Sequence, residues 1–148
     1  MRLEMGLLPP STNSAYDGAR IAPLFLALTA LATLAPALIH SFLPDGGAHS
    51  IAGLDLGDRA GLVISVFRWE GATQLAWGLA MLAVALRYRP LTPLFLLLAI
   101  IERGLMALHI WVLAPPGDGH YPPEAFGSLA FLPLALIALF LALRPRAR

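Results

Sequence analysis

Four long apolar segments alternate with short polar connections along the chain. They cover residues 21–43, 67–88, 91–113 and 125–143. The polar residues of the first segment are Thr29, Thr33, His40 and Ser41. Each segment has about 19–23 residues, enough for a helix to cross a hydrocarbon core of ~30 Å. The pattern predicts four membrane-spanning helices.

Composition supports a membrane protein over a soluble one. Of the 148 residues, 58% are hydrophobic and 13% are charged, whereas soluble domains are roughly half apolar and a quarter charged. The connections are rich in Pro, Gly and Asp, and no internal repeat interrupts the chain, so residues 1–148 are interpreted as one domain. The first twenty residues lack the features of a signal peptide, and we expect the first segment to remain as an anchor.

The distribution of charge predicts an orientation. Arginines flank the second connection and follow the fourth segment, at positions Arg87, Arg89, Arg144, Arg146 and Arg148. The first and third connections carry mainly acids, namely Asp45, Asp55, Asp58, Asp118 and Glu124. The positive-inside rule then places both termini in the cytoplasm. The predicted fold class is all-α, a transmembrane four-helix bundle.

Composition also excludes several classes of function. A net charge of +1 without a basic patch argues against nucleic acid as a partner. The chain has no cysteine, which excludes disulfides, thiol catalysis and cysteine-bound metals.

Charged and polar residues interrupt the second and third segments at similar depths. Glu102 and Arg103 lie close to the midplane, Glu102 being ~16 Å from Leu91 by helical rise. Because a short connection joins the two segments, we expect them to be antiparallel neighbours. Glu70 and His109 would then share a level, ~26–27 Å from that connection.

Helical spacing gathers these residues into two stripes. Glu70, Gln74 and Trp77 follow an i, i+4, i+7 pattern on the second segment, and Glu102, Met106 and His109 repeat it on the third. Facing inward, the stripes would line a polar cleft that opens toward the outer side, with Arg68 and Trp69 at its mouth. His40 lies near the same level.

Arg103 needs a partner, because an unpaired charge at the bilayer centre costs at least ~2.5–3.5 kcal/mol. Glu70 is the expected partner. Arg103 lies about 100° around the helix from Glu102, so the acid and the base should face different neighbours.

Three classes of function stay open from the residues alone. The leading one is a protein that binds an apolar ligand in the cleft, such as a lipid, quinone or isoprenoid, or that serves as an accessory subunit. A small membrane enzyme is the first alternative, with Glu102 or Glu70 as acid, His109 as base and Arg103 as a stabilising group. A transporter subunit is the second.

The candidate ligand-binding residues are Arg68, Trp69, Gln74, Trp77, Arg103, Met106 and His40. The histidines His40 and His109 could ligate haem, and Glu70 could complete a zinc site, but no motif supports either. No metal is predicted and the cofactor is unknown. The expected partners are the lipid bilayer, a small hydrophobic ligand, and a membrane-protein partner or a second copy of the chain.

The layout resembles the DoxX-like group of small bacterial four-helix membrane proteins and related uncharacterised proteins. The resemblance rests on an R-x-x-G opening of the second segment, here Arg68-Trp69-Glu70-Gly71, and on a third-segment arginine, here Arg103. It covers residues 53–144 and implies a four-helix fold in the bacterial inner membrane. Some members of the group are linked to quinone or thiol redox systems, and the lack of cysteine leaves no basis for a thiol role here.

Overall fold

A computed structural model describes residues 7–117 and 119–145. Within these residues the chain forms helices and no strand, which confirms the predicted all-helical class. The long helices are α1 (Ile21–Phe42), α2 (Ala60–Arg87), α3 (Thr92–Leu108) and α4 (Pro123–Leu143), and a π-helical turn, His109–Leu113, continues α3. Short 3-10 turns, η1 to η3, cover Asn13–Ala15, Gly57–Arg59 and Arg89–Leu91. Asp118, Arg146 and Arg148, used above to predict orientation, lie outside the described residues.

Three helical stretches are long and apolar enough to cross a membrane, namely Ile21–Phe42, Arg89–Leu113 and Pro123–Leu143. Large aliphatic side chains on these stretches are exposed, including Leu28, Leu31, Leu97, Leu136 and Ile137. Exposed apolar surface on this scale suits a lipid environment better than water. The chain is therefore a multi-pass membrane protein.

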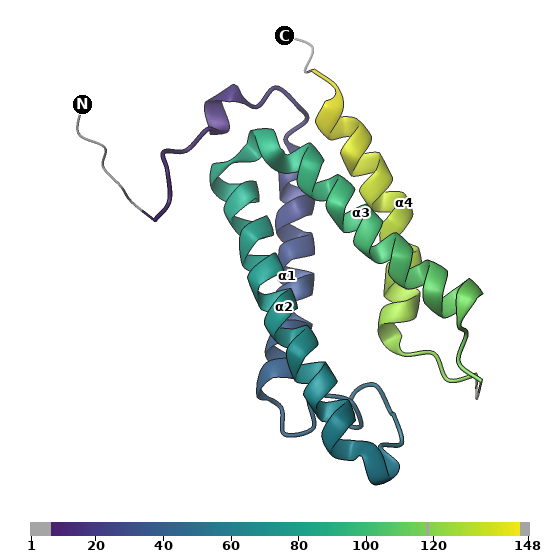
Figure 1. Ribbon diagram of the computed structural model, residues 1–148. Coiled ribbons are helices and arrows are strands. Elements are labelled where there is room, and N and C mark those ends of the chain that lie inside the picture. Colours follow the sequence, from purple (N-terminus) through teal and green to yellow (C-terminus); the bar gives the residue numbers. More distant parts are fainter. Residues whose placement is uncertain (1–6, 118, 146–148) are drawn as a thin grey trace.

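The helices form two antiparallel pairs, α1 with α2 and α3 with α4, arranged as a V (Figure 1). The pairs converge at the end where both termini and the α2–α3 connection lie, and they spread apart toward the other end. α2 and α3 were predicted to be antiparallel neighbours. They meet over only a few residues, where Trp77 contacts Glu102, and α2 packs mainly on α1.

Glycines explain why α2 packs so closely on α1. A Cβ atom added at Gly71 would lie 2.8 Å from the Cβ of His40, and one added at Gly78 would lie 2.8 Å from the side chain of Leu34. Real side chains do not approach this closely. The two glycines therefore let the α1 and α2 backbones come closer than larger residues would permit.

The apolar core lies at the convergent end, where all four helices contribute mostly small side chains. Its buried members are Ala22, Leu26, Ala30, Met81, Val84, Ala85, Leu96, Ala138 and Ala142. The segment before α1 closes this end, because the Ser11 hydroxyl and the Asn13 amide donate hydrogen bonds to the last carbonyls of α2. These donors satisfy carbonyls that have no partner within the helix.

The start of α2 differs from the expected one. The helix begins at Ala60 after the turn Gly57–Arg59, and no side chain caps it. Asp58 lies within that turn and makes no capping hydrogen bond to the helix. Just before the turn, the Asp55 carboxylate accepts a hydrogen bond from the Gly57 amide at 3.1 Å.

Candidate functional site

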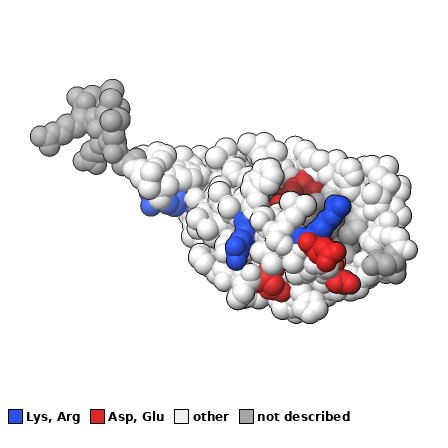
Figure 2. Space-filling model, turned by 60° about the horizontal axis from the view of Figure 1, so that its bottom comes forward, with Lys and Arg blue, Asp and Glu red and all other residues white. Residues whose placement is uncertain are grey.

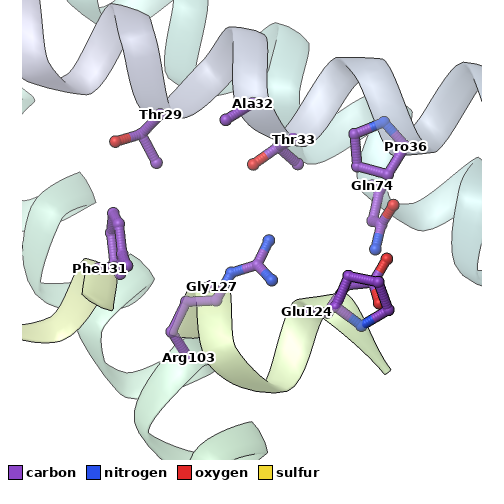
Figure 3. A pocket seen from close by; sticks show the side chains of 10 residues that line it. Thr29, Ala32, Thr33, Pro36, Gln74, Arg103, Glu124, Gly127 and Phe131 are labelled. Carbon is purple, nitrogen blue, oxygen red and sulfur yellow. The ribbon is translucent and has the colours of Figure 1, made fainter. Parts of the chain in front are cut away.

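A cavity of about 340 Å³ lies between the two helix pairs, in the half of the molecule where they spread apart. Arg103 of α3 directs its guanidinium across this cavity toward α1, where Thr29 and Thr33 lie opposite (Figure 3). Phe131 and Glu124 of α4 lie on either side of the arginine in this view. All four helices thus contribute to the lining.

Arg103 has little bonding within the protein. Its closest polar contact is the Sδ atom of Met106 at 3.9 Å, and among the described residues it forms no ion pair. The predicted pair with Glu70 was wrong. Instead, the Glu70 carboxylate accepts a hydrogen bond from the side-chain amide of Gln74 at 3.0 Å, and Arg103 lines a cavity that does not include Glu70.

Glu102 faces a different neighbour, in agreement with its angular separation from Arg103. Its carboxylate accepts a hydrogen bond from the Trp77 indole at 3.0 Å, and the Trp77 ring stacks on Phe95 with centroids 5.2 Å apart. Glu102 and Trp77 line a separate cavity of about 390 Å³ together with Glu70 and Gln74. The adjacent charges of α3 therefore serve two different cavities.

Gln74 lies where three cavities meet. It lines the two already described and a third of about 280 Å³, which also includes His40, Met106 and Glu124. The Gln74 side chain is 6% exposed, and its Oε1 atom has no hydrogen-bond partner in the described structure. A buried acceptor without a donor costs free energy, on the order of 1–3 kcal/mol, so Gln74 marks the polar centre of the molecule.

Three of the predicted binding residues, His40, Arg68 and Trp69, either contact the connection after α1 or are exposed. The His40 ring contacts the Gly46 carbonyl through Nδ1 at 2.7 Å, and its other side meets the Phe67 ring edge-on. Arg68 donates to the Pro44 carbonyl at 3.2 Å. Trp69 is 76% exposed and is not among the residues that line the three cavities.

His109 is exposed at the start of the π-helical turn, and it also lies outside the lining of these cavities. The structure thus brings Glu70, Gln74, Trp77, Glu102, Arg103, Met106 and His40 to the cavities, without Arg68, Trp69 and His109. Among the described residues, no three His, Asp or Glu side chains group closely enough to hold a metal ion.

Sequence reasoning missed Thr29, Thr33 and Glu124 as site residues. Thr29, Thr33, Pro36 and His40 recur at helical spacing and form one stripe of α1, which could have been compared with the stripes of the other helices. Glu124 was counted only as a loop charge. It belongs to the first turn of α4, which begins at Pro123, and both residues are typical of helix starts.

The connection after α1 is ordered by a single carboxylate. Asp45 accepts hydrogen bonds from the backbone amides of Ser50, Gly47 and His49 and from the Ser50 hydroxyl. These bonds, that from the Ser50 amide first, lower the pKa of Asp45 to about 2. Toward this end of the molecule, acidic and arginine side chains lie among uncharged surface (Figure 2).

A second contact at this end joins the two helix pairs. Nε2 of His120, in the connection before α4, lies 2.7 Å from the Ala52 carbonyl in the connection after α1. Ala52 also lines the 280 Å³ cavity. The two connections therefore close the spread end of the V beside that cavity.

No family model, no curated protein and no solved structure matches this chain. The resemblance to the DoxX-like group therefore stays a prediction.

Proposed function

We propose that this chain is a four-span protein of the bacterial inner membrane that binds the polar head of an apolar ligand between its two helix pairs. A lipid, a quinone or an isoprenoid are the ligand classes considered. In this proposal α2 is the fourth span. Its 28 residues would extend ~42 Å, and its contact with α1 would shield part of its polar surface from lipid.

The proposed orientation places both termini in the cytoplasm. Arg87, Arg89 and Arg144 lie at or next to the ends of helices at the convergent end of the V. The connections at the other end carry Asp45, Asp55 and Asp58. Positive charge on the cytoplasmic side is the usual arrangement in membrane proteins.

The observation that carries the proposal is the unpaired Arg103. The residue lies two positions past the middle of the apolar stretch Arg89–Leu113, and its guanidinium enters a cavity rather than a carboxylate pair. An arginine at this depth costs at least ~2.5–3.5 kcal/mol unless another group compensates. A bound phosphate, carboxylate or carbonyl would compensate it through charge-assisted hydrogen bonds.

Shape supports the same conclusion. A volume of about 340 Å³ lies within the range of ligand pockets, roughly 300–1,000 Å³. Apolar side chains such as Ala32, Pro36 and Phe131 line the cavity together with the polar and charged ones. This combination is typical of sites in which polar groups fix a head and apolar walls hold the remainder of a ligand.

The acid–base enzyme is less well supported. Its proposed acid Glu102 and its stabilising Arg103 line different cavities, and its proposed base His109 lines none of the three. A reaction centre needs these groups within hydrogen-bond reach of one substrate.

Native mass spectrometry of the protein in mild detergent tests the proposal. We expect the wild type to carry a small hydrophobic molecule. In Arg103→Gln the affinity for this molecule should fall at least tenfold, seen as a lower fraction of ligand-bound protein. Arg68→Gln is the matched control, because it removes an arginine that lies outside the three cavities.

Two results would contradict the proposal. Bare protein in every variant would show that the cavity holds no stable ligand. Equal occupancy in wild type and Arg103→Gln would place the ligand elsewhere. Co-purification of other subunits in place of a ligand would favour the accessory role.

A further inference from the structure

The cavity around Arg103 contains one positive and one negative side chain that do not pair with each other. Arg103 and Glu124 both line it, yet no ion pair joins them, and Glu124 has no hydrogen-bond partner among the described residues. They point into different parts of the space (Figure 3). Both charged groups are therefore available to bind a ligand in the cavity.

Each of the two charged side chains has a polar side chain nearby in the cavity. The Thr33 side chain lies opposite the guanidinium, is 2% exposed, and makes no hydrogen bond within the described residues. Gln74 lies beside Glu124 in this view, and both residues also line the neighbouring cavity. One end of the space thus offers N–H and O–H donors, and the other offers the Glu124 carboxylate as an acceptor.

The charge balance selects among the ligand classes of the proposed function, on which this inference rests. An anionic head would satisfy Arg103 but would face the Glu124 carboxylate. A quinone or isoprenoid would leave both charges without a counter-charge at low dielectric. A zwitterionic head, which has no net charge but carries a separate anion and cation, can provide a counter-charge for both Arg103 and Glu124.

The chemistry of the acceptor end indicates the cation. A primary ammonium has N–H donors for a carboxylate, whereas a quaternary ammonium has none and is usually held by aromatic faces. Glu124 supplies the carboxylate here, and Phe131, the one aromatic side chain among the described residues that line the cavity, lies on the far side of Arg103 from Glu124.

We infer that the cleft binds a zwitterionic lipid whose head joins a phosphate to a primary ammonium, as in phosphatidylethanolamine. The phosphate contacts Arg103 and Thr33, and the ammonium contacts Glu124. The same head chemistry exists in soluble phosphoethanolamine compounds. The apolar walls and the exposed leucines on the neighbouring helix faces assign the site to the lipid form.

Competition among three synthetic lipids tests this inference on the purified full-length protein. Phosphatidylethanolamine, phosphatidylcholine and phosphatidylglycerol with identical acyl chains are supplied together in equal amounts, and native mass spectrometry measures which is retained. We expect the wild type to retain phosphatidylethanolamine about tenfold over the other two. An excess of soluble glycerophosphoethanolamine should not displace it.

Two substitutions assign the contacts. Arg103→Gln should lower phosphatidylethanolamine retention about tenfold, and Glu124→Gln should remove the preference over phosphatidylcholine and raise retention of phosphatidylglycerol. Arg68→Gln and Asp58→Asn, which change exposed charges outside the cavity, should leave the preference as in the wild type.

The outcomes separate this inference from the proposed function. Equal retention of the three lipids by the wild type, or preference for phosphatidylglycerol, overturns the assignment of the head while a ligand still binds. Displacement by glycerophosphoethanolamine overturns the lipid assignment. Failure of the wild type to retain any lipid or quinone overturns both proposals. The wild-type competition decides the matter even where a variant does not fold.

Discussion

The close approach of α1 and α2 at Gly71 makes a sharp prediction about stability. In Gly71→Ala, the added methyl group would lie 2.8 Å from the His40 Cβ and 2.9 Å from the Ser41 backbone nitrogen. Ordinary contacts begin near 3.4 Å, so α1 must move away by about 0.6 Å. A backbone atom cannot rotate aside as a flexible side chain can.

The magnitude follows from two opposing effects. Overpacking a close interface typically costs about 1–3 kcal/mol. Alanine recovers up to about 1 kcal/mol over glycine within a helix. With the full gain, the free energy of unfolding should fall by about 0–2 kcal/mol, and the shift should reach the His40–Gly46 contact because His40 is the residue displaced.

Gly61→Ala is the matched control in the same helix, since no atom lies within 4 Å of its added Cβ. That variant should be as stable as the wild type or more stable by up to about 1 kcal/mol. Circular dichroism at 222 nm, followed against temperature or denaturing detergent, measures both. If Gly71→Ala proved as stable as Gly61→Ala, the described packing of α1 on α2 would be wrong.

Further predictions concern a loop and an interhelical hydrogen bond. The native pKa of Asp45 lies below its usual 3.8, so its stabilisation of residues 45–50 is complete above about pH 4 and is lost as the pH falls toward 2. Hydrogen exchange of the Ser50 amide, expressed as protection relative to the intrinsic rate at each pH, should show this loss. In Asp45→Asn the same amide should lack that protection already at neutral pH. Glu102→Met removes the acceptor of the Trp77 indole and should cost about 1 kcal/mol in thermal unfolding, whereas Glu102→Gln keeps an acceptor and should cost less. Equal losses in the two Glu102 variants would show that the hydrogen bond does not form.

The helical class and three of the apolar stretches could be predicted from the sequence, because hydropathy over about 20 residues depends on composition alone. The beginning of α2 was less accessible. Polar residues such as Arg68 and Glu70 lower the apolar character of a helix that nonetheless continues from Ala60 to Arg87. The expected start at 67 missed the first two turns.

The pairing of helices could not be predicted from loop length. The short connection between α2 and α3 suggested a long contact, but small residues decide how closely helices approach in a membrane, and Gly71 and Gly78 direct α2 toward α1. The error carried over to the charges, since Arg103 lines the cavity beside α1 and α4 whereas Glu70 does not. Arg103 therefore faces a cavity that also contains Glu124, a residue assigned to a loop until the first turn of α4 placed it in the site.

Cryo-electron microscopy of the protein in a lipid bilayer disc would show whether Arg103 contacts a bound ligand. We expect elongated density between the helix pairs, with its polar end within hydrogen-bond distance of the Arg103 guanidinium and its apolar part between α1 and α4. A direct ion pair between Arg103 and Glu124, with the cavity closed and no density beside it, would refute ligand binding at this site.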